Sequence, residues 1–190
     1  MAEFIDPAIV PKVTLPSGEE VPCMGMGTFG SDRVSAEDVS AAVAGAIRSG
    51  YRMFDCAACY GNEHQIGEVF KTAFDEGVCR KEKIFIMTKV WNDMHRKVEE
   101  ACTKSIQDLQ CDYVDLYFIH WPFPNYHAPF CDVEFQNPDS RPFSVEELWI
   151  HIVSVKTGRK RKDPLHWYFQ YDHPETGSGS SFNENQTGSL

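Results

Sequence analysis

Residues 51–55 read YRMFD, a short apolar run that ends on an acidic side chain. Two later runs also end on a polar side chain: IFIMTK at 84–89 and VDLYFIH at 114–120. The closing residues, Asp55, Lys89 and His120, are separated by about the length of one strand, one helix and two loops. In a parallel α/β barrel the carboxyl ends of successive strands meet at one site. The spacing therefore predicts that an acid, an amine and an imidazole lie together at one end of a sheet.

The segments around these runs predict repeated strand and helix units. We expect a hairpin over 13–22, then strands over 23–28, 51–55, 83–89 and 113–119. Amphipathic helices are expected after Ser35, which with Asp38 resembles a capping box, after Asn62 as a capping residue, and over 98–109. The strands are nearly continuous apolar runs, as is typical of parallel strands covered on both faces. The pattern is that of an α/β protein.

Composition limits the class of protein. A chain of 190 residues with 42% hydrophobic residues is long enough for one domain with a real core. The net charge of −10 argues against nucleic acid or an anionic membrane as a partner. Seven cysteines at scattered positions fit reduced thiols, and neither a secretory signal nor an apolar run of membrane-spanning length is evident. We therefore expect a soluble, cytoplasmic protein.

The pattern changes near residue 150. A further helix is predicted to begin at Ser144, with Glu147 completing a capping box. After Trp149 the helical periodicity stops, and residues 177–190 are rich in Gly, Ser, Asn and Thr. We therefore divide the chain into a domain over 1–149 and a divergent, poorly ordered tail over 150–190.

Several motifs occur together and in a fixed order. They are MGMGT at 24–28, GYRMFDCA at 50–57, YGNE at 60–63, IG at 66–67, TKVW at 88–91 and IHWP at 119–122. Over residues 10–149 this set resembles the first half of an aldo-keto reductase. The resemblance implies a (β/α)8 barrel of the TIM type, of which this chain offers about four units as a half-barrel after the hairpin. Motifs for the last four strands have no counterpart here.

The resemblance also implies a function. It predicts NAD(P)H-dependent reduction of an aldehyde or ketone to an alcohol, with NADPH expected more than NADH. It places the catalytic roles, the cofactor contacts and the walls of the substrate pocket on specific residues. The catalytic residues are Asp55, Tyr60, Lys89 and His120; the cofactor contacts are Gly27, Thr28 and Asp55; the substrate-pocket residues are Phe29, Trp91, His120 and Trp121. No metal is expected.

Within that tetrad, general chemistry suggests the role of each group. Tyr60 would be the general acid, and the ammonium of Lys89 would lower the pKa of the phenol by favouring its ionised form. Asp55 would hold Lys89 in place and charged. A neutral His120 would orient the carbonyl oxygen through one hydrogen bond. Aromatic pocket walls suit aromatic or aliphatic carbonyl compounds.

Plainer interpretations of the same residues remain open. Asp55 and Lys89 would also fit a structural ion pair, His120 a core histidine, and Gly27 a glycine needed only for tight packing. The CAAC sequence at 56–59 raises redox or zinc chemistry, but it has no second cysteine pair and lies outside a thioredoxin-like context. For the whole chain, the alternative is a non-catalytic half-barrel that is inactive or associates with a partner through open sheet edges.

Overall fold

The computed structural model describes residues 6–15, 18, 20–30 and 33–121. The elements, in chain order, are η1 (Pro7–Ile9), β1 (Lys12–Thr14), β2 (Glu20–Pro22), β3 (Met26–Gly27), α1 (Ala36–Arg48), β4 (Met53–Asp55), η2 (Ala58–Tyr60), α2 (Glu63–Asp75), η3 (Lys81–Lys83), β5 (Phe85–Val90), η4 (Asn92–Met94), α3 (Val98–Asp108) and β6 (Leu116–Ile119). The predicted hairpin, strands and helices up to residue 121 are therefore present. The strand expected over 23–28 is shorter than predicted, because only Met26 and Gly27 pair with β4.

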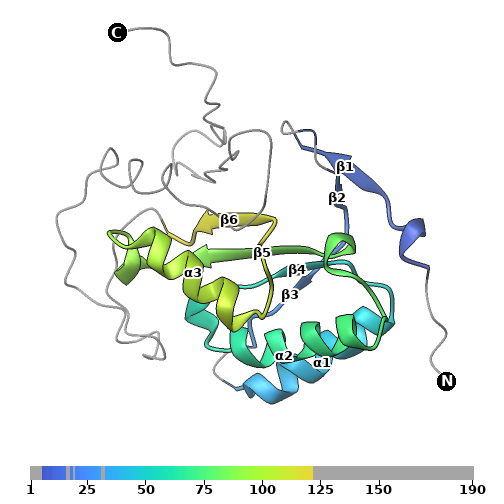
Figure 1. Cartoon of the computed structure of the whole chain (residues 1–190), viewed down its shortest axis with the longest axis horizontal. Coiled ribbons are helices and arrows are strands. Elements are labelled where there is room, and N and C mark those ends of the chain that lie inside the picture. The colour runs from blue at the N-terminus through green and yellow to red at the C-terminus, as the bar shows by residue number, and fades with distance from the viewer. Residues whose placement is uncertain (1–5, 16–17, 19, 31–32, 122–190) are drawn as a thin grey trace, which may run out of the picture.

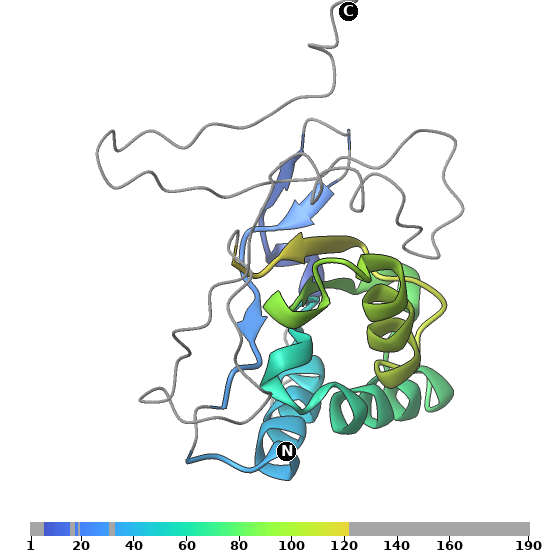
Figure 2. The ribbon, with the colours of Figure 1, turned by 90° about the vertical axis from the view of Figure 1, so that its left-hand side faces the viewer.

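The main sheet has the strand order β3-β4-β5-β6, and every neighbouring pair is parallel. Figure 1 shows α1, α2 and α3 on one side of this sheet, with the antiparallel β1–β2 hairpin standing apart from them. The turned view in Figure 2 shows the same separation. In the described part of the chain the sheet is open, with β3 and β6 at its edges. This is the α/β arrangement of successive units in a (β/α)8 barrel, without closure.

Alternation along the strands sends side chains to two different cores. On the helix side, Phe54, Ile86 and Tyr117 are buried against the inward stripes of the helices. The opposite, inner face carries a smaller cluster that Val21 and Leu15 of the hairpin segment help to cover. It contains Met53, Phe85, Met87, Leu116 and Phe118. Two-sided coverage explains why the strands are apolar almost throughout.

The helix ends follow the expected signals, with one difference. The Ser35 hydroxyl accepts a hydrogen bond from the Asp38 amide at 3.1 Å, as an N-cap should. Gly50 and Gly77 adopt positive φ angles just beyond α1 and α2. Asn62 stands at the start of α2, but its side chain makes no capping bond there. It donates instead to the Thr28 carbonyl at 2.8 Å, so it links the start of α2 to the end of β3.

Two features of α2 fix its distance from its neighbours. The Glu63 carboxylate is buried and accepts hydrogen bonds from Thr88 at 2.6 Å and Ser105 at 2.9 Å, which connects α2 to β5 and α3. Burial raises the pKa of Glu63, and these two hydrogen bonds oppose the rise. A side chain at Gly67 would place its Cβ 2.0 Å from the Asp108 carbonyl oxygen, so α2 meets the end of α3 at a glycine.

Several predictions concern residues outside the described part of the chain. They are the helix from Ser144, the domain boundary after Trp149 and the tail over 150–190.

In the described residues, no helix combines the length and the apolar character needed to cross a membrane.

Candidate active site

The inner-face alternation brings the three strand-end residues together. Asp55 lies two positions after Met53, Lys89 two after Met87 and His120 two after Phe118, so each continues the row of inner-face side chains beyond the apolar cluster. The register pairs Asp55 with Met87 and Lys89 with Phe118, so each strand-end residue lies two positions further along its strand than the one on the preceding strand. The predicted convergence of Asp55 and Lys89 is present, and Tyr60 joins them from η2.

The Lys89 ammonium has three acceptors around it. It donates to Asp55 Oδ1 at 2.5 Å, to the Cys56 carbonyl at 2.9 Å and to Tyr60 Oη at 3.4 Å. An ammonium group has three donors and no acceptor, so these three contacts use all of them. The lysine side chain is 14% exposed, and that of Asp55 is 38% exposed. The amine is therefore held in one place by an ion pair that is itself open to a ligand on its carboxylate side.

The pKa of Tyr60 moves in the direction opposite to the expected one. Burial raises the pKa of the phenol above its ordinary value, and the charge and hydrogen bond of Lys89 oppose that rise without cancelling it. The expectation of a lowered pKa considered the ammonium and left out desolvation, which requires the folded structure to assess. The phenol is therefore protonated at neutral pH.

His120 lies in an aromatic environment beside the phenol. Its ring meets those of Tyr60 and Trp91 edge to face, with centroids 5.7 and 5.0 Å away. Burial and, to a smaller extent, the Lys89 charge lower the pKa of His120 to about 4, while Asp55 acts in the opposite direction. The imidazole is consequently neutral at physiological pH.

The residues predicted to line a substrate pocket surround the same two rings. Phe29 packs against Tyr60 with centroids 5.0 Å apart, and Trp121 stacks on His120 at 6.3 Å with a 14° angle between the rings. Phe29 is 64% exposed and Trp121 is 55% exposed. These large apolar surfaces are available to a ligand beside the phenol and the imidazole, although their role in binding stays a prediction.

Gly25, just before β3, and Gly27, within β3, differ in their surroundings. A Cβ on Gly25 would lie 2.8 Å from Met53 Cγ, so this glycine is required by packing. A Cβ on Gly27 would have no atom within 4 Å, so the packing explanation does not apply there. Gly27 pairs with Asp55 and leaves open space next to the tetrad, where a flat ring could approach the backbone. The site thus has room on this side for the predicted nicotinamide.

Thr28 acts mainly within the protein. Its amide and its hydroxyl both donate to the Asp55 carbonyl at 3.0 Å, and its own carbonyl accepts from Asn62. Its side chain is buried. Thr28 therefore fixes the backbone that carries Asp55, and a direct contact with a cofactor stays a prediction.

Sequence reasoning missed the roles of Asn62, which ties β3 to α2, and of Cys59. The Sγ atom of Cys59 lies 3.3 Å from Nδ1 of His120, whereas Cys56 is completely buried. Both are free thiols, and the described residues contain no group of His, Cys, Asp or Glu that could hold a metal ion. Proximity of residue 59 to His120 could have been suspected only from its place beside Tyr60.

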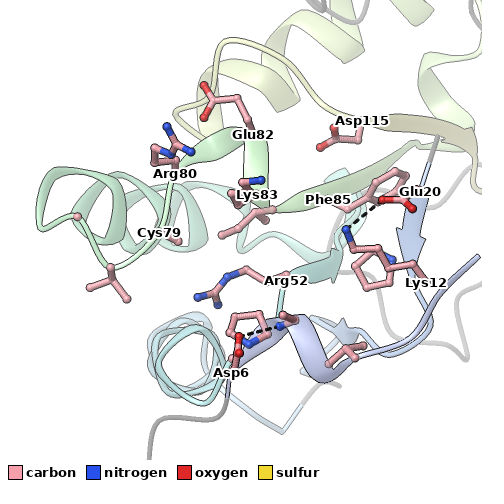
Figure 3. Close-up of a pocket in the computed structure, with 18 residues that line it drawn as sticks. Asp6, Lys12, Glu20, Arg52, Cys79, Arg80, Glu82, Lys83, Phe85 and Asp115 are labelled. Atoms are coloured by element: carbon pink, nitrogen blue, oxygen red, sulfur yellow. Dashed lines mark hydrogen bonds and ion pairs between the residues drawn. The ribbon is translucent and has the colours of Figure 1, made fainter.

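A groove of about 800 Å³ lies at the other end of the sheet, between the N-terminal segment and the loops before β4 and β5. Figure 3 shows charged side chains of both signs around it, including Lys12 paired with Glu20 at 3.2 Å. Its lining contains no member of the tetrad. This groove is thus formed by other residues than those with catalytic potential.

Comparison with known proteins identifies similar sequences and structures. The model of the Aldo/keto reductase family matches residues 23–159. The NADP-dependent D-sorbitol-6-phosphate dehydrogenase of Malus domestica is 44% identical over 115 residues, which are 60% of this chain and 36% of that protein. The NADH-dependent D-xylose reductase of Candida parapsilosis is 40% identical over 146 residues, covering 73% of this chain and 43% of that protein.

Among solved structures, a Bombyx mori aldo-keto reductase in complex with NADP superimposes with a TM-score of 0.63 and 33% sequence identity. The match covers 75% of this chain and 45% of that one. The chain therefore spans less than half the length of these relatives.

Proposed function

This chain belongs to the aldo/keto reductase family, and from that premise we propose that it carries the proton-transfer half of a carbonyl reductase that uses a nicotinamide cofactor. The observation that carries the proposal is the coordination of Lys89, whose three donors meet Asp55, the Cys56 carbonyl and the Tyr60 hydroxyl. A structural ion pair would have no need to present its ammonium to a phenol.

Tyr60 is the proton donor in this proposal. Because a charged lysine cannot accept a hydrogen bond, the Tyr60 oxygen must accept from Lys89. The hydrogen of the phenol is then free to point at a carbonyl oxygen. The raised pKa keeps that hydrogen in place at neutral pH, and the adjacent ammonium stabilises the phenolate that remains after transfer.

The other two residues of the tetrad set the geometry. Asp55 holds Lys89 in position through a 2.5 Å ion pair. Neutral His120 offers one ring N–H to the same carbonyl oxygen that Tyr60 protonates. Phe29, Trp91 and Trp121 offer aromatic surface beside the phenol and the imidazole, which favours an apolar aldehyde or ketone, aromatic or aliphatic.

When bound, the cofactor supplies a hydride. Gly27, Asp55 and the backbone of Thr28, whose carbonyl accepts a hydrogen bond from Asn62, would hold the nicotinamide end of the cofactor. The open space at Gly27 supports this placement. We propose NADPH as the main cofactor and NADH as the less favoured one. Both occur in the names of relatives: the D-sorbitol-6-phosphate dehydrogenase is NADP-dependent and the Candida parapsilosis reductase is NADH-dependent.

The acidic composition and the lack of a long apolar run support a cytoplasmic location and small-molecule partners, without nucleic acid or membrane.

The alternative function is an inactive chain that associates through its sheet edges. It is supported by the unpaired edges of β3 and β6 in the described residues.

The test compares the 190-residue chain with a version completed by fusion to the second half of a relative. The completed chain should oxidise NADPH in the presence of an aromatic aldehyde, and NADH more slowly. The 190-residue chain should bind NADPH weakly or not at all in a fluorescence titration, because the matched region covers only 36% of the D-sorbitol-6-phosphate dehydrogenase and the motifs of the last four strands have no counterpart here. A completed, folded chain that fails to reduce any of a panel of aldehydes and ketones would refute the proposal.

A further inference from the structure

Cys59 makes a polar contact with the candidate catalytic imidazole. Its Sγ atom lies 3.3 Å from Nδ1 of His120, across 61 positions of sequence, and both groups are partly buried. Cys59 belongs to η2, the same short turn that carries Tyr60. The turn therefore delivers two neighbouring side chains to the site, the phenol toward Lys89 and the thiol toward the ring of His120.

The direction of this hydrogen bond follows from the states of the two groups. Burial raises the pKa of the Cys59 thiol to about 12, so sulfur keeps its hydrogen at neutral pH. His120 is neutral there, and a neutral imidazole has one N–H donor and one bare nitrogen acceptor. Sulfur is a weak acceptor, whereas a bare ring nitrogen is a good one. The favoured arrangement is S–H donating to an unprotonated Nδ1.

This direction matters because the two ring nitrogens of histidine are distinct. The hydrogen bond made by one nitrogen determines which of them carries the proton. If Nδ1 accepts from Cys59, the hydrogen must be on Nε2. The aromatic neighbours Tyr60 and Trp91 meet the ring edge to face and so restrict its orientation, but such packing does not select between the two tautomers.

We propose that Cys59 is a positioning residue, whose thiol fixes His120 in the tautomer that carries its hydrogen on Nε2 and thereby keeps that N–H available to a carbonyl oxygen. The last step rests on the proposed function; the tautomer itself does not. In the sequence, the two cysteines at 56 and 59 raised only redox or zinc chemistry, as an alternative to the family resemblance. In the structure the second of these cysteines, Cys59, contacts the imidazole of His120.

The direct test is nitrogen NMR of the 190-residue chain labelled with ¹⁵N-histidine, with the His120 signals identified by their loss in His120→Gln. Long-range proton–nitrogen correlations distinguish a protonated from an unprotonated ring nitrogen. We expect the unprotonated nitrogen of His120 to be Nδ1 and the protonated one to be Nε2. A His120 ring protonated at Nδ1 would overturn the proposal.

Variants of Cys59 then show whether the thiol is the cause. Cys59→Val removes the donor while keeping an apolar side chain of similar size, and the ratio of the Nε2–H to the Nδ1–H tautomer should fall roughly fivefold, the factor that one neutral hydrogen bond contributes. Cys59→Ser keeps a donor and should restore the ratio. Cys59→Ala serves in place of the valine variant if that protein does not fold. An unchanged ratio in the valine or alanine variant would show that packing alone sets the tautomer.

A second measurement uses the completed chain. Cys59→Val should lower kcat for an aromatic aldehyde, by at most roughly the fivefold change in the tautomer ratio, because a smaller fraction of the enzyme holds the competent tautomer. Cys59→Ser should recover most of that loss. If the completed chain has no reductase activity but NMR still gives the expected tautomers, the proposed function fails and the role of Cys59 stands. If activity is present and the tautomers do not respond to Cys59, the reverse holds.

Discussion

Two lysine–aspartate pairs lie at opposite ends of the same region of sheet, and only one has the features of an active site. Lys89 meets Asp55 at the carboxyl end of β5, and Lys81 meets Asp115 just before its amino end. In both pairs the partners are 34 positions apart in sequence, and both contacts are short, 2.5 and 2.8 Å. Sequence spacing and charge alone therefore do not distinguish the two pairs.

Their surroundings separate them. The Asp115 carboxylate is 6% exposed and also accepts the Ile86 amide at 2.8 Å, while the Lys81 ammonium covers the Tyr113 ring at 3.7 Å. The Asp55 carboxylate is 38% exposed, and Lys89 gives its third hydrogen bond to a phenol. A buried ion pair whose other contacts are all within the protein holds two segments of the chain together. One that shares its ammonium with a titratable group and opens toward solvent is available for chemistry.

The strongest test of the difference between the two ion pairs removes the hydroxyl of the tyrosine next to each lysine. In the completed chain, Tyr60→Phe should lower carbonyl reduction by roughly 10²–10⁴-fold, the usual contribution of general acid catalysis, while the affinity for NADPH changes little. Tyr113→Phe is the matched control, because phenylalanine keeps the ring under Lys81. Steady-state kinetics and a cofactor titration on both variants decide the matter. Near-normal turnover by Tyr60→Phe would remove the main support for an active site at the carboxyl end.

Removing the ammonium at each end should give opposite results. Lys81→Met leaves a buried carboxylate without its cation, so the free energy of unfolding should fall by about 3 kcal/mol. Lys89→Met leaves a carboxylate that is partly solvated, so its cost in stability should be smaller while reduction by the completed chain is largely lost. Urea unfolding and kinetics on the same two variants test this. Equal destabilisation by both would mean that the pairs are alike after all.

Gly25, just before β3, and Gly27, within β3, sharpen the comparison further. Gly25→Ala forces a Cβ against Met53 and should destabilise the fold by about 1–3 kcal/mol. Gly27→Ala meets no atom of the protein, so stability should change little, but its methyl group would fill the space proposed for the nicotinamide and weaken NADPH binding by the completed chain. Thermal unfolding and cofactor titration separate the two effects. Unchanged NADPH affinity in Gly27→Ala would place the cofactor elsewhere.

The smallest effect concerns acid stability. Burial lowers the pKa of both His95 and His120 to about 4, below the ordinary value near 6.5. Between pH 6.5 and 4 the unfolded chain therefore binds more protons, and the free energy of unfolding should decrease as the pH falls through this range. The raised pKa of Glu63 acts in the opposite direction.

Replacing His120 with Gln should make stability less dependent on pH over that interval. The control is His64→Gln, because His64 is exposed on α2 and its ion pair with Glu68 is at the surface. Urea midpoints at pH 7 and pH 5 provide the measurement. A pH dependence that is the same in the wild type and in His120→Gln would mean that the imidazole is solvated rather than buried.

The site could be predicted in part from residue order. Asp55, Lys89 and His120 close their strands. Each lies two positions after an inner-face residue of its strand, so alternation is enough to place all three side chains on the inner face of the sheet. Tyr60 required the family resemblance, because it comes from a turn with no periodic signal. The catalytic and binding roles of these residues stay predictions until the proposed variants are measured.

The contacts of single polar side chains could not be predicted. Asn62 has the right place for a helix cap, yet it donates to Thr28, because the end of β3 passes close to the start of α2 only in the folded chain. The predicted direction of the shift in the Tyr60 pKa was wrong for a related reason. Proximity of a positive charge can be inferred from spacing, whereas the extent of desolvation depends on everything packed around the phenol.

The sequence by itself determined the α/β class, the order of the units up to residue 121, the helix start at Ser35 and the family to which the chain belongs. These follow from periodicity, capping and backbone preferences, which act over a few neighbouring residues. Only the tertiary structure decided that Lys89 has three acceptors, that Gly27 is open while Gly25 is packed, and that Cys59 lies against His120. Those facts depend on distances and burial between segments far apart in sequence, and such quantities exist only once the strands have assembled.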